Sequence, residues 1–181
     1  MLTKKVESAP FFLIIGAPNA GKTSLLYRLY SGIYYPEIQL TLRDFEELKV
    51  DKARLRSLNI LENNLHKEEW EKFASGCSAV IFIVDTSTND GILIGQKLFQ
   101  EIILVNSVQN IPIAIFANKS DLRLYNKLHL EQNLMVPGIQ SNPERIEIFN
   151  VSVKTSEGII IGMEWIMKKS NVHFYIPSFR K

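Results

Sequence analysis

The chain has little of several features that would mark other classes of protein. Cys77 is its only cysteine in 181 residues, which excludes an internal disulfide and is typical of a reducing compartment. The net charge of +2 is too small to indicate nucleic-acid binding. No apolar run approaches the length of a membrane span, and the isolated His66, His129 and His173 have no metal-ligand spacing. A hydrophobic content of 46% instead predicts one soluble globular domain with a substantial core.

The first residues also lack targeting signals. Met1 to Lys5 contain no hydrophobic stretch of the secretory type. Residue 2 is leucine, where N-myristoylation requires glycine. We expect a flexible N-terminus over residues 1–9 and a cytoplasmic protein without a direct lipid anchor, which partners recruit if it acts at a membrane.

Residues 16–23, with the sequence GAPNAGKT, fit the pattern G-x-x-x-x-G-K-[ST] of the phosphate-binding P-loop. Its glycines let backbone N–H groups approach phosphate oxygens closely. The Lys22 ammonium reaches the β- and γ-phosphates, and the Thr23 hydroxyl is placed to ligate Mg²⁺. The predicted nucleotide-binding residues of this stretch are Gly16, Pro18, Asn19, Ala20, Gly21, Lys22, Thr23 and Ser24.

The surrounding pattern supports this interpretation and indicates an α/β fold. An apolar strand over residues 11–15 precedes the loop, and a helix with Leu25, Leu26 and Leu29 on one face follows it. Further strands are predicted over residues 45–50, 53–58, 79–84, 111–117 and 147–151, with Asp51-Lys52 as a hairpin turn. Helices are predicted over residues 65–75, around Ile94, Leu98, Ile102 and Val105, over 125–135, and around Ile159, Met163, Ile166 and Met167. This alternation predicts a mostly parallel sheet covered on both faces.

A second motif, Asn118-Lys119-Ser120-Asp121, follows a buried strand and has the form N-K-x-D. An ionised carboxylate only accepts hydrogen bonds. Asp121 can therefore accept from the N1–H and the 2-amino group of guanine, whereas adenine has no N1–H to donate, and such a mismatch discriminates strongly. The stem of Lys119 can cover one face of the purine, and the Asn118 side chain can tie this loop to the P-loop backbone.

A third motif, Ser152-Val153-Lys154, follows the last predicted strand. It looks like the S-A-K element, in which a backbone N–H contacts guanine O6 and a lysine stacks below the base. Because ligands of parallel sheets sit at the carboxyl ends of the strands, the three motifs are expected to converge on one site.

With these motifs in this order, the chain resembles a small GTPase, and most closely the Arf and Arf-like family. The resemblance covers about residues 10–170 and includes Trp70 and Trp165, which fall where the family has tryptophans in its second and last helices. It implies a three-layer P-loop NTPase fold, with a six-stranded, mostly parallel sheet and helices on both faces. It also implies GTP or GDP with Mg²⁺ as cofactors, and protein effectors and regulators as partners.

The chain departs from the family after the third strand, where D-x-G-G-Q is expected and Asn59-Ile60-Leu61-Glu62-Asn63 is found. The neutral Asn59 would hold a Mg²⁺-bound water less well than the family aspartate. Glu62 replaces a glycine that donates to the γ-phosphate, and its carboxylate would repel that phosphate. Asn63 is one methylene shorter than the glutamine that orients the attacking water, so it is expected to be a weak catalytic substitute.

The first switch region departs as well. Ungapped spacing places Leu40 where the family has a threonine that ligates Mg²⁺, and Thr41 is the next residue. A shift of one residue would let Thr41 serve as a metal ligand beside Thr23. The half of the site that holds nucleotide therefore matches the family, and the half that senses the γ-phosphate does not.

We therefore expect a monomeric, guanine nucleotide-binding, Arf-like small GTPase with slow or impaired GTP hydrolysis, acting as a regulatory switch or by recruiting effectors. Lost γ-phosphate contacts weaken the difference between the GTP-bound and GDP-bound conformations. The alternative is a pseudo-GTPase scaffold with a structural nucleotide or none, whose affinity for partners would not depend on GTP versus GDP. A P-loop kinase is disfavoured, since only Arg123 and Arg145 lie where an arginine-rich lid would need them.

Three features outside the motifs have open or minor roles. Asp85 ends the fourth strand, where a Walker B acid could lie, but the resemblance to the family implies a structural role for it. Cys77 precedes a buried strand and is expected to be inert. Residues 171–181 form an aromatic C-terminal tail, and the sequence leaves open whether it packs on the domain or anchors a partner.

Overall fold

The computed structural model describes residues 9–36, 45–58, 67–122 and 144–180. Several expectations lie outside these ranges: the flexible N-terminus up to residue 8, the helix over residues 125–135, His66 and His129, and the switch residues Leu40, Thr41, Asn59, Glu62 and Asn63. The remaining elements can be compared with the sequence directly.

A six-stranded sheet forms the middle layer, in the order β2-β3-β1-β4-β5-β6. Only β2 runs antiparallel, paired to β3 through the turn at Asp51, and the other described neighbours are parallel. This confirms the mostly parallel sheet. The strands are Phe11–Gly16 (β1), Phe45–Val50 (β2), Ala53–Leu58 (β3), Ala79–Asp85 (β4), Ile113–Asn118 (β5) and Ile146–Asn150 (β6).

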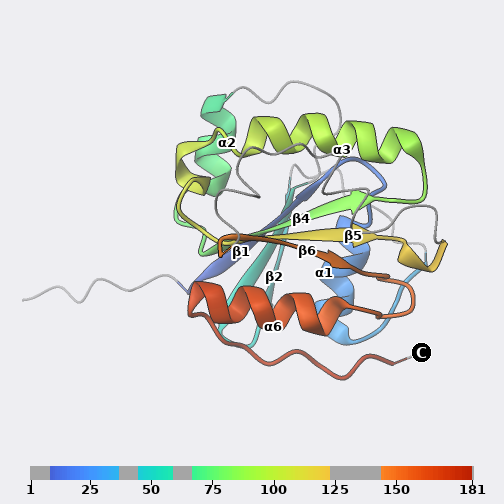
Figure 1. Ribbon diagram of the computed structural model, residues 1–181. Coiled ribbons are helices and arrows are strands. Elements are labelled where there is room, and N and C mark those ends of the chain that lie inside the picture. Colours follow the sequence, from blue (N-terminus) through green and yellow to red (C-terminus); the bar gives the residue numbers. More distant parts are fainter. Residues whose placement is uncertain (1–8, 37–44, 59–66, 123–143, 181) are drawn as a thin grey trace, which may run out of the picture.

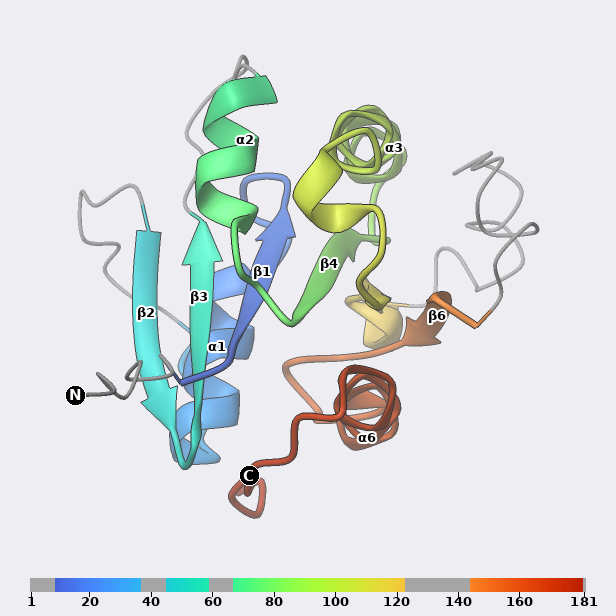
Figure 2. The same ribbon diagram turned by 90° about the vertical axis from the view of Figure 1, so that its left-hand side faces the viewer.

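Helices cover both faces of this sheet. Figures 1 and 2 show α2 and α3 over one face and α1 and α6 over the other. Among the described residues, the α-helices are Lys22–Ser31 (α1), Lys67–Ala74 (α2), Asn89–Ile102 (α3) and Ile159–Ser170 (α6), and short 3₁₀ turns span Asn106–Val108 (η1) and Ser120–Leu122 (η2). The described helices are too short or too polar to span a membrane. Three layers around a parallel sheet place the loops after β1, β5 and β6 at one edge.

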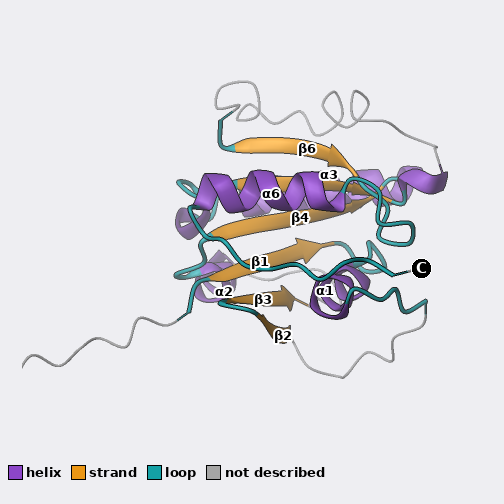
Figure 3. Ribbon diagram, turned by 90° about the horizontal axis from the view of Figure 1, so that it is seen from below, coloured by secondary structure: helices purple, strands orange, loops and turns teal. Residues whose placement is uncertain are grey.

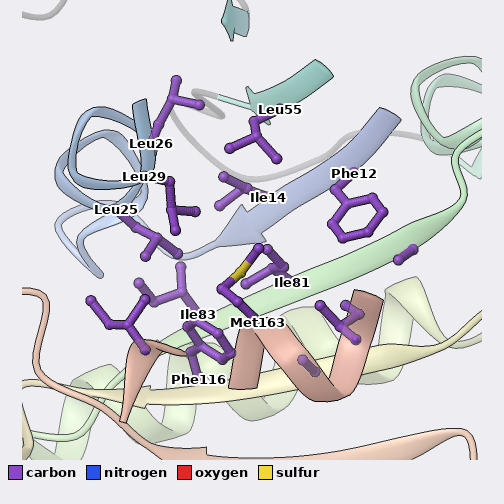
Figure 4. Close-up of a cluster of buried hydrophobic side chains, with 14 of the residues drawn as sticks. Phe12, Ile14, Leu25, Leu26, Leu29, Leu55, Ile81, Ile83, Phe116 and Met163 are labelled. Atoms are coloured by element: carbon purple, nitrogen blue, oxygen red, sulfur yellow. The ribbon is translucent and has the colours of Figure 1, made fainter. Parts of the chain in front are cut away.

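Each face of the sheet has its own hydrophobic core. On the α1–α6 face, Phe12, Ile14 and Phe116 meet Leu25 of α1 and Met163 of α6, all of them buried (Figure 4). On the other face, Trp70 of α2 and Phe99 of α3 pack over buried strand residues. Strands buried on both sides explain the continuous apolar runs of the sequence.

The predicted face of α3 is right at Ile102, which is buried, and at Leu98, which packs half-buried against the core, and it is wrong at Ile94. Ile94 is 49% exposed, and the helix buries Ile92, Gly95 and Phe99 together with Ile102. Gly95 sets this register, since a Cβ there would lie 2.9 Å from Cγ1 of Val84, so only a glycine lets the helix approach β4 this closely. The helix ends at Ile102, and the buried Val105 belongs to the turn that follows.

The C-terminal residues run back along the α1–α6 face of the domain (Figure 3). Phe174 is buried with its ring 5.4 Å from that of Phe12, edge to face. The Arg180 N–H donates to the carbonyl of Gly32 at the end of α1, 2.7 Å away. In this structure the tail therefore packs on the domain, which is one of the two possibilities that the sequence left open.

Candidate functional site

The P-loop connects β1 to α1, as its position in the sequence predicts. Within it, the Lys22 ammonium donates to the carbonyl oxygens of Gly16 (3.0 Å) and Ala17 (2.9 Å). Burial lowers the pKa of this lysine to about 8, because a charged ammonium loses hydration there. An anion at the loop would restore the preference for the charged form.

The two motif glycines are required by close contacts within the protein. A Cβ at Gly16 would lie 2.2 Å from the carbonyl oxygen of Ile83 on β4. Gly21 has a φ of 103°, and a Cβ there would lie 2.4 Å from Nδ2 of Asn118. The loop is therefore pressed against the ends of β4 and β5, which fixes its path.

The side chain of Asn118 joins the three motif loops. Its Nδ2 donates to the carbonyl of Ala20 in the P-loop at 2.7 Å, as expected from the sequence. Its Oδ1 accepts from the Val153 N–H at 3.0 Å. Both bonds are buried, so the amide fixes the P-loop and the third loop relative to each other. The Val153 N–H, one of the backbone groups that the resemblance would assign to guanine O6, thus donates to Asn118 in this structure.

Asp121 and Ser152 form the next contact between loops. The Ser152 hydroxyl donates to Oδ1 of Asp121 at 2.8 Å and accepts from the Thr155 N–H at 3.1 Å. Ser152 itself is fully buried. This bond leaves the carboxylate of Asp121 with further acceptor positions at the pocket.

Lys119 is anchored by Asp85, an interaction that the sequence analysis did not predict. Its ammonium lies 2.5 Å from Oδ2 of Asp85. Burial by itself raises the pKa of the Asp85 carboxyl, but hydrogen bonds from Lys119 and Ser87 outweigh burial and keep that pKa below its ordinary value. The ion pair holds the aliphatic part of Lys119 at the pocket, which agrees with the structural role expected for Asp85.

A pocket of about 320 Å³ opens between these loops, at the lower end of the range for small-molecule sites. Residues from all three motifs line it: Asn19, Gly21, Ser24, Asn118, Lys119, Asp121, Val153 and Lys154. The other predicted residues belong to the P-loop, the start of α1 or the loop after β6 and are not among the lining residues: Gly16, Pro18, Ala20, Lys22, Thr23 and Ser152. Tyr34 and Leu122 also line the pocket, and neither belongs to a motif that predicts the site from the sequence. Tyr34 lies in the loop after α1, where the sequence has no pattern typical of a nucleotide site.

Thr23, which the sequence predicts as a Mg²⁺ ligand, is the second residue of α1 and is largely buried. No group of three or more His, Cys, Asp or Glu side chains among the described residues is arranged to bind a metal. The other predicted ligand, Thr41, and the predicted catalytic substitute, Asn63, lie outside the described residues.

Comparison with known proteins agrees with this arrangement. The model of the ADP-ribosylation factor (Arf) family matches residues 3–170. The chain belongs to this family. Its members are small GTPases, which bind guanine nucleotides and work with effectors and regulators.

Relatives of several kinds match over most of the chain. ADP-ribosylation factor 3 of Arabidopsis thaliana is 26% identical over 155 residues, which cover 85% of this chain and 84% of that protein. ADP-ribosylation factor-related protein 1 of Homo sapiens is 26% identical over 180 residues, covering 89% and 86%. The solved structure of the Arl6 BBS3 small GTPase of Trypanosoma brucei with the bound nucleotide analogue GppNp has a TM-score of 0.71 at 18% identity, covering 91% of this chain and 98% of that one. The last likeness shows the fold, with the sheet and layers described above.

Proposed function

We propose that this Arf-family protein binds GTP and GDP in the pocket between the three loops, with Asp121 reading the guanine edge and Lys22 contacting the phosphates. The observation that supports this most is the set of bonds from Asn118, which joins the phosphate loop to the base loops around one pocket. The Asp121 carboxylate faces this pocket and is held by Ser152.

Thr23 would hold Mg²⁺ through its hydroxyl in this proposal, since Thr23 directly follows Lys22 at the start of α1. The ion would neutralise phosphate charge. The protein's own part is to present the hydroxyl and to keep the loop in place through Gly16 and Gly21.

Titration of fluorescent GTP and GDP analogues into nucleotide-stripped protein with Mg²⁺ tests the proposal. We expect micromolar or tighter binding of both analogues and no comparable binding of an ATP analogue. Lys22→Ala and Asp121→Ala should each abolish most of it. Equal affinity for ATP and GTP analogues would contradict the role of Asp121. No binding of any nucleotide would favour the pseudo-GTPase scaffold.

We further propose that GTP hydrolysis is slow, on the basis of Asn59, Glu62 and Asn63 in the sequence. Each replaces a family residue that acts near the γ-phosphate or its attacking water. Single-turnover hydrolysis should be slower than roughly 10⁻⁴ s⁻¹, the scale of small GTPases without an activating protein. The double variant Glu62→Gly/Asn63→Gln should hydrolyse faster. Wild-type hydrolysis at the ordinary rate would contradict this part.

Recruitment of effectors is the third part of the proposal. If the protein retains a partial switch, partner affinity will differ between the GTP-bound and GDP-bound forms, because a ligand shifts an equilibrium only by its differential affinity. The affinity of a captured partner, measured for the GTP-bound and the GDP-bound form, distinguishes a partial switch from the scaffold, for which the two affinities would be equal.

A further inference from the structure

Arg28 is a buried cation of α1 that the proposed nucleotide site does not use. Only 3% of the residue is exposed. Its Nε donates to the hydroxyl of Ser156 at 3.0 Å, and its Nη2 donates to the same oxygen. Its Nη1 donates to the carbonyl of Arg180 at 2.9 Å, and its guanidinium lies 5.2 Å from the ring centre of Phe179. One side chain therefore joins α1, the loop after β6 and the C-terminal end of the described chain.

Residues 172–180, here called the C-terminal strap, reach Arg28 along a fixed path (Figures 1 and 3). The strap leaves α6 with the Val172 N–H bonded to the carbonyl of Met167 at 3.1 Å. The Tyr175 N–H donates to Asp51 in the β2–β3 turn at 3.1 Å. Near its end, the strap lies so close to Gly32 that a Cβ there would be 2.5 Å from the Ser178 carbonyl oxygen. The end of the strap is thus held at α1 by backbone contacts as well as by Arg28.

Three consecutive hydrogen bonds connect Arg28 to Asp121 at the pocket. Ser156, which accepts from Arg28, has a left-handed backbone with a φ of 73°. Its N–H donates to the Ser152 carbonyl at 2.7 Å. The Ser152 hydroxyl in turn donates to Asp121 at 2.8 Å. A non-glycine residue in this conformation needs support from its surroundings, and the fork of Arg28 supplies it.

We propose that Arg28 and the C-terminal strap are positioning elements of the base pocket, which hold the loop over residues 152–156 so that Asp121 is oriented toward guanine. This inference rests on the proposed function. Guanidinium donors have a rigid planar geometry, so the strap carbonyl and the Ser156 hydroxyl fix each other's place through Arg28. Loss of the strap end should therefore weaken reading of the base more than contact with the phosphates.

The affinities of GDP and inosine diphosphate (IDP), measured by calorimetry, distinguish these effects. IDP keeps the phosphates and the N1–H but lacks the 2-amino group that Asp121 can accept from. Deletion of residues 178–181 removes Phe179 and the Arg180 carbonyl and leaves the Phe174 contact with Phe12. We expect GDP affinity to fall roughly tenfold and IDP affinity to fall much less, so that the ratio of the two affinities contracts.

Point variants locate the effect. Ser156→Ala should contract the GDP-to-IDP ratio as the deletion does, and Arg28→Lys, which keeps the charge but not the fork, should contract it partly. Arg145→Lys is the matched control, since Arg145 also donates to two backbone carbonyls, those of Val108 and Ile111, at 2.8 and 3.3 Å. It should leave the ratio unchanged. An unchanged ratio in the deletion and in Ser156→Ala, with only a lower unfolding temperature, would overturn the proposal.

Amide hydrogen exchange of residues 152–156 without nucleotide tests the same idea independently of binding. We expect faster exchange in the deletion than in the full chain, and unchanged exchange would also overturn the proposal. If the wild-type chain binds neither GDP nor IDP, the proposed function fails, and the exchange experiment alone then decides whether the strap holds this loop.

Discussion

Two charged side chains of the site are held by fixed neighbours in the protein. Asp121 accepts from the Ser152 hydroxyl, and Lys22 donates to the carbonyls of Gly16 and Ala17. Because both side chains are already ordered before a ligand binds, less conformational entropy is lost on binding. Substitutions at these positions should therefore change specificity and pH dependence in defined ways.

Asp121→Asn should exchange the preferred base. The asparagine oxygen can still accept from N1–H and from Ser152, but its NH₂ group meets the 2-amino group of guanine donor to donor. Xanthine carries an oxygen at that position and can accept. We expect GDP affinity to fall roughly a hundredfold or more and xanthosine diphosphate affinity to rise, measured by calorimetry. A parallel loss of affinity for both nucleotides would contradict the assigned role of Asp121.

The pKa of Lys22, lowered to about 8, predicts a pH-dependent affinity. In the unligated fold Lys22 loses its proton as pH rises through about 8, whereas in the unfolded chain it stays protonated up to about 10.5. The cost of burying the charged ammonium is therefore relieved above pH 8, and the stability of the unligated protein rises with pH in this range. Nucleotide phosphates need the charged form. Affinity for GDP should therefore fall above pH 8, by at most about tenfold per pH unit.

Titrations of GDP between pH 7 and 9 check this dependence. Lys22→Arg, whose side chain stays charged over this range, is the control, and any slope that remains in it belongs to other groups, including the base itself. If wild-type and variant slopes are equal, Lys22 does not set the pH dependence.

At the scale of elements, the contact between β1 and β4 explains why the P-loop begins with glycine. Gly16 pairs with Ile83 at the end of the parallel ladder. The structure leaves no space for a side chain there, because a Cβ would lie 2.2 Å from a backbone oxygen of β4. A strand oxygen cannot move aside without breaking the sheet pairing.

Gly16→Ala should therefore destabilise the fold, by about 1–3 kcal/mol as for overpacked sites. Gly76→Ala separates sterics from backbone strain, since Gly76 has a φ of 75° and a Cβ there would meet nothing within 4 Å. We expect the smaller cost for Gly76→Ala, about 1 kcal/mol. Urea unfolding followed by circular dichroism measures both. A cost at Gly16 no greater than at Gly76 would mean that the end of β1 relaxes.

At the scale of the whole molecule, the proposed ligand lies between loops from distant parts of the chain. The P-loop, the loop after β5 and the loop after β6 meet only in the folded protein. A nucleotide bound there contacts the native state and not the unfolded chain, so binding adds to global stability.

GDP at a hundred times its Kd should stabilise the protein by about 2.7 kcal/mol. For a chain of this size we expect the unfolding temperature to rise by roughly 5–10 °C. Differential scanning fluorimetry with GDP, and with ADP as the control, measures the shift. Equal shifts with ADP would show that phosphate contacts alone account for binding.

Much of the fold could be predicted from the sequence because the signals are local. Apolar runs marked the strands, and the spacing of Ile159, Met163, Ile166 and Met167 gave the buried face of α6, where all four are buried. The face of α3 was predicted wrongly at Ile94, because Ile92 and Ile94 are both isoleucines in an apolar helix. The choice between them depends on how closely Gly95 approaches Val84 across the layers.

The sequence by itself determined the motifs of the site and their order, because a P-loop, N-K-x-D and S-V-K each carry their chemistry in a few adjacent residues. Only the tertiary structure decided how the loops are held together. The bonds of Asn118, the pairing of Lys119 with Asp85, and the contacts of Arg28 with Ser156 and Arg180 join residues up to 152 positions apart. Such contacts depend on where the sheet and the C-terminal strap bring side chains in space, and no spacing along the chain encodes them.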